Sequence, residues 1–346
     1  QAQLTYRCSV AWPTWREATQ HALYGPDGFY RRERPGDHFR TSVRASPLFA
    51  RAVESVARQC GVGTVVDLGA GGGELLRELH RRAPELELIG VDLASRPDQL
   101  PGPIGWTDRL SDGLVDVLVI ANEWLDDLPV DVVEIDETGM PCLVHVEPET
   151  GAERLGNPPG PDDESWLARW WPLDEAEPGA RAEIGRERDS AWADAVRRVR
   201  RGVLVAIDYW HRRGDRPPTG TLAAYRAGRM VPPVPDGSCD ITAHVALDSC
   251  ASAGDEAGAT ATLLTTQRHA LRALGVDASL PPRTLALDDS QAYLAALSQT
   301  TQAVELLDPA GLGAFGWLIQ TVNRALPDVL ARLDTSTDRG VVRRTR

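Results

Sequence analysis

The stretch TVVDLGAGGGEL, residues 64–75, decides the fold that we predict for this chain. An apolar run at 64–66 leads into Asp67 and a glycine-rich turn, and residues 74–82 continue with leucines at helical spacing. This pattern predicts a strand, a tight turn and a helix. Glycines let a backbone turn sharply and lie against a ligand without a Cβ in the way. The N–H groups and the positive dipole end of the new helix then favour an anionic group.

The spacing of the glycines excludes two kinds of ligand. A dinucleotide fingerprint needs glycine at 74, where the chain has Glu74. A Walker phosphate loop needs a lysine, and all 37 basic residues are arginine. The remaining pattern, D-x-G-x-G-x-G, is typical of methyltransferases that use S-adenosylmethionine (SAM). Asp67 would face the amino group of SAM, and Gly69, Gly71 and Gly73 would shape the turn that holds its carboxylate. The alternative is a structural glycine turn.

A second acid follows the next predicted strand. Residues 86–91 form another buried-strand pattern that ends in Asp92, about 25 residues after Asp67. An acid near this offset binds the ribose hydroxyls of a nucleotide cofactor, although it would also suit a helix cap. Both signals in order, with a helix between them, predict a βαβ unit.

Residues 104–108 form a short third strand or its exit. Acidic and aromatic side chains at such an exit bracket an adenine ring, so Trp106 and Asp108 are candidate cofactor residues. The alternative places Trp106 in the core and Asp108 in a turn.

The strand at 116–121 runs into Asn122, Glu123 and two further acids, Asp126 and Asp127. In open α/β sheets, ligands bind beyond the carboxyl ends of the strands, so we expect the methyl acceptor here. Glu123, Asp126 and Asn122 are the candidate catalytic residues, because they can hold a nucleophile and neutralise the proton that it loses. The methyl group of SAM is already electrophilic; the protein needs mainly to align the acceptor. Alternatively, Asp126 and Asp127 cap the next helix.

Length and composition limit the function classes. The 346 residues suffice for one large domain or two modest ones. A formal charge of −13 without a basic run argues against a nucleic-acid partner, and no apolar run is long enough to span a membrane. Five scattered cysteines without C-x-x-C suggest neither a zinc site nor a disulfide framework, so we expect no metal and a cytoplasmic location. Arginine for every base suits a high-GC, bacterial coding bias.

We expect an α/β fold: a class I SAM-methyltransferase (Rossmann-like) sheet with helices on both faces. The predicted division is an N-terminal helical and lid segment (1–60), a SAM-binding core (61–150), an insertion that covers the pocket (151–200), and the rest of the sheet with C-terminal elements (201–346). Helices are expected at 5–23 and 184–200, and a hairpin at 132–146. The last strand is expected at 314–322, and the final arginines form a solvated tail. A polar loop at 36–42 offers Asp37, Thr41 and Ser42 as lid contacts to the cofactor.

Several short motifs, in this order, resemble the MidA-type (DUF185) SAM-dependent methyltransferases, relatives of a mitochondrial complex I assembly factor that dimethylates a protein arginine. The motifs are GFY at 28–30, GD at 36–37, TS at 41–42, the glycine turn at 67–73, NEWLDDLP at 122–129, IDY at 207–209, GTLAAYR at 220–226, DITAHV at 240–245 and TQ at 266–267. The resemblance runs from about residue 24 to 276. It implies a class I core with a helical lead-in and an inserted, partly helical subdomain, and it suggests Tyr209 and His244 as substrate-side residues.

One departure from the family pattern concerns the acceptor. The family's early loop continues T-S-P-E, whereas this chain has Val43 and Arg44 at the last two positions. An acid that would face a guanidinium has become a cation, which would repel a guanidinium and tolerate a neutral or acidic acceptor. Arg44 is therefore a candidate substrate residue, unless it points to solvent.

The sequence leaves three functions open. The first is methyl transfer from SAM to a nitrogen or oxygen, on protein arginine by resemblance. The second is transfer to a small metabolite, and the third is a non-catalytic SAM-binding assembly factor. A nicotinamide oxidoreductase is disfavoured, because Glu74 stands where the dinucleotide fingerprint needs a glycine. The expected partner is a protein or small-molecule acceptor, and a homodimer stays open.

Overall fold

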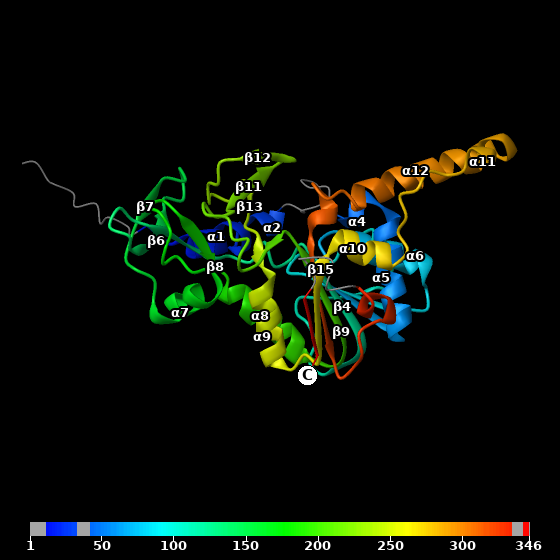
Figure 1. The fold of residues 1–346 in the computed structure, drawn as a ribbon, viewed down its shortest axis with the longest axis horizontal. Helices are drawn as coiled ribbons and strands as arrows, with labels where there is room; N and C mark the ends of the chain where they lie inside the picture. Colours follow the sequence, from blue (N-terminus) through cyan, green and yellow to red (C-terminus); the bar gives the residue numbers. More distant parts are fainter. Residues whose placement is uncertain (1–11, 33–41, 334–341, 346) are drawn as a thin grey trace, which may run out of the picture.

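The computed structural model describes residues 12–32, 42–333 and 342–345, and its centre is a twisted eight-stranded sheet (Figure 1). The strand order is β17-β15-β16-β9-β4-β1-β2-β3. The strands β9, β4, β1, β2 and β3 are parallel to one another. Beyond β9, each of β16, β15 and β17 pairs antiparallel with the strand before it in the sheet. In chain order the strands are β1 (Thr64–Leu68), β2 (Glu87–Val91), β3 (Gly105–Thr107), β4 (Leu114–Asn122), β9 (Val199–Asp208), β15 (Ala261–Thr266), β16 (Gly316–Val322) and β17 (Val342–Thr345).

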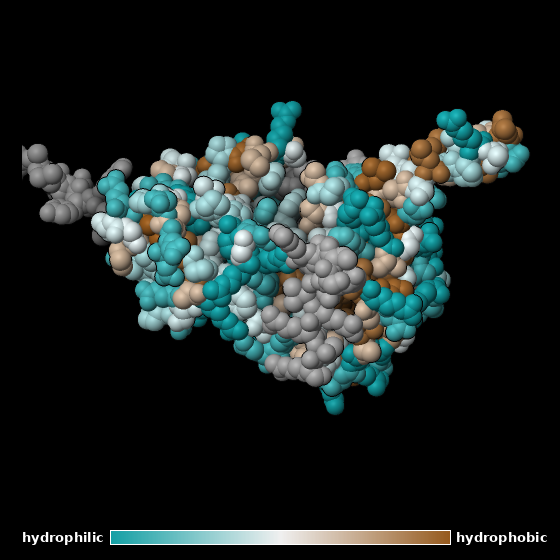
Figure 2. Space-filling view, in the orientation of Figure 1, coloured by the Kyte–Doolittle hydropathy of each residue, from teal (hydrophilic) through white to brown (hydrophobic). Residues whose placement is uncertain are grey.

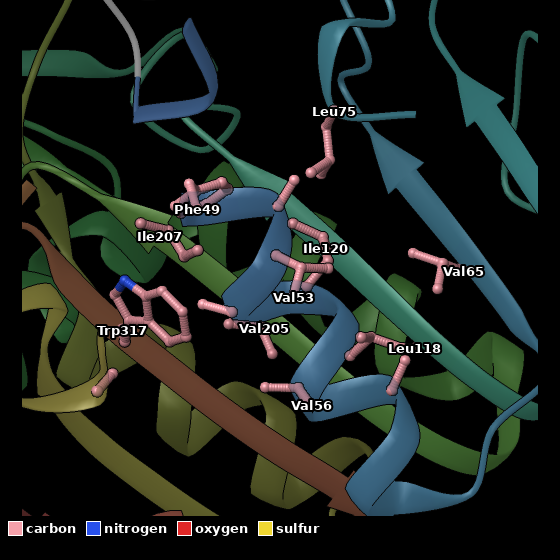
Figure 3. Close-up of a cluster of buried hydrophobic side chains, with 14 of the residues drawn as sticks. Phe49, Val53, Val56, Val65, Leu75, Leu118, Ile120, Val205, Ile207 and Trp317 are labelled. Carbon is pink, nitrogen blue, oxygen red and sulfur yellow. The ribbon is translucent and has the colours of Figure 1, made fainter. Parts of the chain in front are cut away.

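Both faces of this sheet are covered by helices, because the apolar residues of its strands point alternately to either side. Val65 and Leu118 pack with α5, α6 and α10, whereas Val66 and Val119 pack with α8 and α9. Figure 3 shows the first layer, with Val53 of α5 over β4. The covering helices are α5 (Pro47–Cys60), α6 (Glu74–Arg82), α8 (Arg186–Arg198), α9 (Leu247–Ala257) and α10 (Gln267–Ala273). The predicted α/β sheet with helices on both faces is confirmed.

The helix before β1 has clear start and stop signals. Ser46 caps α5 by accepting a hydrogen bond from the Leu48 N–H, and Pro47 occupies the first turn. Gly61 ends the helix with a left-handed φ of 59°. The buried face of α5 therefore meets the sheet just ahead of the glycine turn.

Two insertions form a second lobe beside the sheet (Figure 1). The first leaves the end of β4 and folds into the antiparallel sheet β7-β6-β5-β8; the second leaves the end of β9 and forms β12-β11-β13 and the pair β10-β14. Their elements are β5 (Asp131–Ile135), β6 (Pro141–Val146), β7 (Glu153–Leu155), α7 (Pro161–Trp170), β8 (Arg181–Ile184), β10 (Trp210–His211), β11 (Ala223–Arg226), β12 (Arg229–Val231), β13 (Asp240–Thr242) and β14 (Val245–Ala246). Since both insertions start at the carboxyl ends of neighbouring strands, the second lobe lies where ligands of such sheets bind.

The N-terminal helices join the second lobe. The helix α1 (Trp15–Tyr24) begins with a capping box between Thr14 and Glu17. Its Trp15 packs with Val132 of β5 and Ile241 of β13 in one buried cluster. This cluster fixes α1, and the short helix α2 (Phe29–Arg32) behind it, against both inserted sheets.

The remaining helices are one short helix before α5 and several in the last quarter of the chain. They are α4 (Ser42–Ala45), α11 (Arg283–Asp288), α12 (Ser290–Leu306), the 3₁₀ turn η1 (Leu312–Ala314) and α13 (Asp328–Ala331). α11 and the start of α12 project from the body, and Figure 2 shows apolar surface on this projection, where Leu287 and Leu294 are exposed. Across the described residues, no helix is long and apolar enough to cross a membrane.

Three predicted boundaries are wrong. The hairpin at 132–146 pairs with β7 and β8, so the division at residue 150 cuts through one sheet instead of separating core from insertion. The helix expected from residue 184 begins at Arg186, because residues 181–184 form β8 and Gly185 caps the helix. The C-terminal arginines are not a free tail: β17 pairs with β15. The N-terminal helix starts at Trp15, and residues 5–11 lie outside the described residues.

Candidate functional site

The glycine turn after β1 has the backbone that the sequence predicts. Gly69, Gly71 and Gly73 have φ of 77°, 54° and 71°, the left-handed region that favours glycine. A Cβ on Gly69 would lie 2.8 Å from the Trp124 side chain. The turn therefore leaves backbone open toward a ligand at the start of α6, where the helix dipole favours negative charge.

A cavity of about 360 Å³, here called the large cavity, opens beside this turn. It is lined by residues from the ends of β1, β2, β3 and β4, from α1 and α2, and from one face of α8. They are Tyr24, Tyr30, Leu68, Gly69, Gly71, Val91, Asp92, Leu93, Ala94, Asp108, Arg109, Leu110, Glu123, Trp124, Asp127, Leu128, Ala191, Asp194, Ala195 and Arg198. Its size and mixed apolar and polar walls suit a nucleoside.

Asp92 lies at the end of β2, on the wall of the large cavity. One carboxylate oxygen accepts a hydrogen bond from the Gly71 N–H at 2.8 Å, and the other accepts from the Ala94 N–H at 2.8 Å. These bonds fix the carboxylate beside the glycine turn. A carboxylate in this place on the cavity wall is a suitable acceptor for a ribose hydroxyl.

The two candidates after β3 separate. Asp108 is exposed and lines the large cavity, in reach of an adenine amino group. Trp106 does not line it, which favours the alternative that places this residue in the core. Its indole packs against Gly90 so closely that a Cβ added at Gly90 would lie 2.4 Å from the ring. The indole N–H donates to the Ala94 carbonyl at 3.0 Å. Trp106 thus fills the space that Gly90 leaves and supports the loop after Asp92.

A second cavity of about 90 Å³, here called the acidic cavity, lies on the other side of the turn. It shares Gly69, Gly71, Glu123 and Asp127 with the large cavity. Its carboxyl side chains are Asp67, Glu74, Glu123, Asp126, Asp127 and Asp240, and its other residues are Val43, Gly69, Ala70, Gly71, Gly72, Leu75, Asn122, Tyr209, Tyr225 and Thr242. In the described part of the chain, no arginine or histidine lines this cavity.

Glu123 stands where the two cavities meet. It follows β4 directly and has a left-handed φ of 53°, which is strained for a residue other than glycine. Its backbone N–H donates to the Ile207 carbonyl at 2.8 Å, and the Asn122 amide donates to its carboxylate at 2.9 Å. Burial raises the pKa of Glu123 to about 8, and the charge of Asp126 adds to the rise.

Asp67 lies at the end of β1 and lines the acidic cavity. Burial raises its pKa to about 8, with smaller contributions from Asp92 and Glu74. A cation placed beside this carboxyl group would stabilise its ionised form. Its place beside the glycine turn is consistent with the predicted contact to an amino group.

Asp126 and Asp208 form a buried carboxyl pair under the acidic cavity. One oxygen of Asp126 accepts from the Thr242 hydroxyl at 2.9 Å, and one oxygen of Asp208 accepts from the Leu125 N–H at 3.0 Å. The two carboxyl groups also hydrogen-bond to each other, and among the described residues neither second oxygen has a partner outside this pair. Burial raises the pKa of Asp208 well above its ordinary value, and the adjacent Asp126 raises it further.

Tyr30 lines the large cavity and reaches an acid of the acidic cavity with its hydroxyl. The hydroxyl donates to Asp240 at 2.6 Å, and burial followed by the charges of Asp127 and Asp240 raises its pKa well above the ordinary value. Tyr24 lies beside it with the rings tilted and their centroids 5.4 Å apart, and its hydroxyl donates to the Asp127 carbonyl at 3.2 Å. Asp240 and Asp126 are therefore held by hydroxyl groups, from Tyr30 and Thr242.

Tyr209 and His244 take different places. Tyr209 lines the acidic cavity and is 37% exposed. His244 lines neither cavity; its ring stacks on Tyr209 with centroids 5.4 Å apart, and burial lowers its pKa. His244 thus supports Tyr209 in this structure, as is common for a lone histidine, and its contact with a substrate stays a prediction.

The lid candidates fall partly outside the described residues. Asp37 and Thr41 lie there, as does the side chain of Arg44. Ser42 is buried and does not line either cavity: its hydroxyl pairs with the Gln267 side chain at 3.2 Å, and its backbone N–H bonds to the Glu123 carboxylate. Ser42 therefore positions Glu123 instead of contacting the cofactor by its side chain.

Sequence reasoning missed Arg188, a buried residue of α8. Its guanidinium donates to the carbonyls of Leu128, Asp126, Ala243 and His244, at 2.5–3.1 Å. It thereby ties the loop after β4 to the loop after β13. No local motif marks this residue, whereas Tyr30, Asp208, Tyr225 and Asp240 belong to the short motifs of the family resemblance.

This geometry can be compared with known protein families and solved structures. Residues 77–265, more than half of the chain, match the family Methyltransf_28, described as "Putative S-adenosyl-L-methionine-dependent methyltransferase". The chain belongs to this family. The predicted family is confirmed, and the chain is a SAM-dependent methyltransferase. No curated protein matches it.

Two solved structures from Burkholderia thailandensis extend this result. The methyltransferase is 26% identical to a COG1565 superfamily member bound to S-adenosyl-homocysteine (SAH), over 94% of this chain and 92% of that chain, with a TM-score of 0.75. It is 27% identical to a native COG1565 superfamily protein, over 94% and 91%, with a TM-score of 0.74. The predicted fold class and the cofactor SAM are confirmed.

The residues present fit this cofactor. The left-handed glycines bring bare backbone to the wall of both cavities, and Asp92 and Asp108 offer acceptors along the large cavity. Asp67 faces the same turn from the acidic cavity. When bound, SAM supplies an electrophilic methyl group. The nucleoside would lie in the large cavity, with Glu123 at its far end toward the acidic cavity.

Proposed function

We propose that this methyltransferase transfers the methyl group of SAM to a cationic nitrogen acceptor, a protein arginine side chain. The observation that carries the proposal is the set of six carboxyl side chains around the acidic cavity, with no basic side chain among the described lining residues. Carboxylates at close range favour a positively charged group and disfavour an anion. This charge outweighs the expectation drawn from Arg44, whose side chain is not described.

Hydrogen-bonding capacity supports the same class of acceptor. Asn122 lines the acidic cavity with a buried oxygen that has no donor among the described residues. A guanidinium carries five N–H donors in a planar fork and matches carboxylate oxygens well. A hydroxyl acceptor has a single donor and leaves buried oxygens unpaired, which costs free energy.

The size of the acidic cavity favours a side chain over a whole metabolite. Its volume of about 90 Å³ is well below the ~300–1,000 Å³ of pockets that enclose drug-sized ligands. Such a volume suits the end of one extended side chain. Within it, Glu123 and Asp126 would align the nitrogen and take the proton that it loses on methylation.

The test is a peptide panel with methyl-labelled SAM. Three peptides share one sequence and carry arginine, lysine or citrulline at the central position; citrulline is the neutral isostere of arginine. We expect label on the arginine peptide and none on the citrulline peptide. Methylation of the citrulline peptide or of small hydroxyl compounds, without methylation of arginine peptides, would overturn the proposal.

A further inference from the structure

We propose that Glu123 makes this enzyme discriminate between SAM and its product SAH, by responding to the charge on the cofactor sulfur. The inference concerns the cofactor and does not depend on which acceptor is methylated. SAM carries a positive sulfonium, and SAH differs from it by the methyl group and that charge. A residue that senses the sulfur can therefore favour the substrate form over the product form.

The position of Glu123 is the first step. It lines both the large cavity and the acidic cavity, so its carboxylate lies on the path from the nucleoside to the acceptor. Its strained φ of 53° and its backbone bond to Ile207 hold the side chain at this junction. Asn122 and Ser42 each donate one hydrogen bond to the carboxylate and carry no charge.

The charges around Glu123 are the second step. The groups around Glu123 come from its own loop after β4, from β1, β2, α4, α6, α8, β9, β11 and β13, from the loop after β3, and from α1 with α2. The titratable groups that face this junction or line the two cavities are Asp67, Glu74, Asp92, Asp108, Asp126, Asp127, Asp194, Asp208, Asp240, Tyr24, Tyr30, Tyr209, Tyr225, His244, Arg109, Arg188 and Arg198. The N–H groups of Arg188 are used by backbone carbonyls, and Arg109 and Arg198 pair with Asp108 and Asp194.

An oxygen without a partner adds an observation independent of charge. Asn122 lines the acidic cavity next to Glu123, and its side-chain oxygen is buried without a donor among the described residues. Asp126, which is 5% exposed, lines the same cavity. Together with Glu123 it presents acceptor oxygens and no cation to whatever lies at the junction. A sulfonium satisfies this environment electrostatically, whereas a neutral thioether does not.

The protonation of these groups gives the discrimination a pH dependence. The raised pKa of Glu123, about 8, means that the free protein keeps this carboxyl largely protonated at neutral pH. A sulfonium nearby stabilises the carboxylate and releases the proton, so SAM affinity rises as pH rises through this range. Asp67 has a similarly raised pKa but faces the amino group, which SAM and SAH share. The ratio of the two affinities therefore isolates Glu123 from Asp67.

This arrangement has a consequence for turnover. After transfer the sulfonium charge is gone, so Glu123 no longer holds the cofactor and rebinds a proton. Product release is then favoured over substrate release, and the preference is strongest above neutral pH.

The experiment is calorimetric titration of the wild-type protein with SAM and, separately, with SAH at pH 6, 7, 8 and 9. At pH 8, two buffers of different ionisation enthalpy count the protons released. We expect the ratio of SAM to SAH affinity to rise about tenfold from pH 6 to pH 9, the effect of a one-unit change in one pKa. At pH 8 SAM should also release up to about half a proton more than SAH, because a group with a pKa of about 8 is half protonated there. A ratio that does not change with pH, with equal proton release, overturns the proposal.

Two variants assign the effect. Glu123→Gln keeps the shape but cannot ionise, so its ratio should be flat across the pH range while SAH affinity stays within about twofold. A ratio that still rises as in wild type would contradict a role for Glu123. The matched control is Asp189→Asn, a buried acid outside both cavities that accepts from Ser249 and Trp166 and whose pKa burial raises to about 6. It should keep the wild-type ratio. The wild-type titrations with SAM and SAH can refute the proposal by themselves, even if a variant misfolds.

Discussion

The large cavity and the acidic cavity meet at Glu123, yet they are built in different ways. Most of the large cavity comes from the ends of four consecutive core strands, β1 to β4, and one face of α8. The acidic cavity collects residues from α4, the glycine turn, the loop after β4, the end of β9, and β11 and β13 of the second lobe. The first is a property of the core, and the second exists only because the insertions fold over it.

The two cavities also differ in how their acids are held. In the large cavity, Arg198 pairs with Asp194 at 2.7 Å, and backbone N–H groups hold Asp92. In the acidic cavity, hydroxyl groups hold Asp126 and Asp240, and the described lining residues include no arginine or histidine. The difference shows that the core strands build the larger space, whereas the second lobe completes a smaller space lined by acids. Substitutions in one cavity, in the wall that both share, or outside both therefore test whether the two act separately.

The largest effect is expected from Gly71→Val, which changes the wall that both cavities share. Gly71 has a left-handed φ of 54°, which a β-branched residue does not tolerate, and no protein atom lies within 4 Å of an added Cβ. The new side chain would therefore distort the turn and occupy cavity space. We expect SAH affinity to fall more than ~100-fold by calorimetry. Gly63→Ala, at an open position without a left-handed φ, is the control; equal affinities for both variants would refute the role of the turn.

Glu123→Gln should separate binding from chemistry. Loss of the carboxylate removes a proton acceptor beside the acceptor nitrogen but keeps the bond from Asn122. We expect turnover of the arginine peptide to fall about 10²-fold, with SAH affinity within about twofold. A fully active variant would remove Glu123 from the chemistry and leave Asp126 as the candidate base.

Tyr30→Phe tests whether the acidic cavity depends on its hydroxyl contacts. The change removes the bond to Asp240 at 2.6 Å and keeps the ring that lines the large cavity. We expect the KM for the acceptor peptide to rise roughly fivefold and SAH affinity to stay within twofold. Tyr24→Phe, which loses only a longer bond to a backbone carbonyl, is the matched control and should change KM less. The reverse order would mean that the Asp240 contact is unimportant.

Trp106→Phe should have the smallest effect on function. The indole packs against Gly90 and donates to the Ala94 carbonyl, so the change costs about 1–2 kcal/mol of stability. Chemical denaturation would measure this loss. SAH affinity is expected to stay within twofold, and a tenfold loss would return Trp106 to the cofactor site.

The different origins of the two cavities explain which site residues could be predicted from the sequence. Asp67, the glycines, Asp92 and Asp108 follow strands that are adjacent in both chain and sheet, so their meeting point is implied by the strand pattern. The two alternatives for Trp106 could not be separated, because the sequence pattern does not show that Gly90 leaves a space for its ring. Tyr225 and Asp240 reach the acidic cavity through an insertion whose path depends on long-range packing around Trp15. The same holds for Arg188, whose four carbonyl partners lie 55–62 residues away.

The central claim is that the core cavity holds the cofactor and that the acidic cavity is reserved for the acceptor. SAH calorimetry on Asp92→Ala and Asp126→Ala tests it most directly, because each change removes one carboxyl group from one cavity. We predict that Asp92→Ala lowers SAH affinity about thirtyfold or more, through loss of a charged hydrogen-bond acceptor for the ribose. Asp126→Ala should leave SAH affinity within about twofold. A large loss in Asp126→Ala with little change in Asp92→Ala would contradict this division.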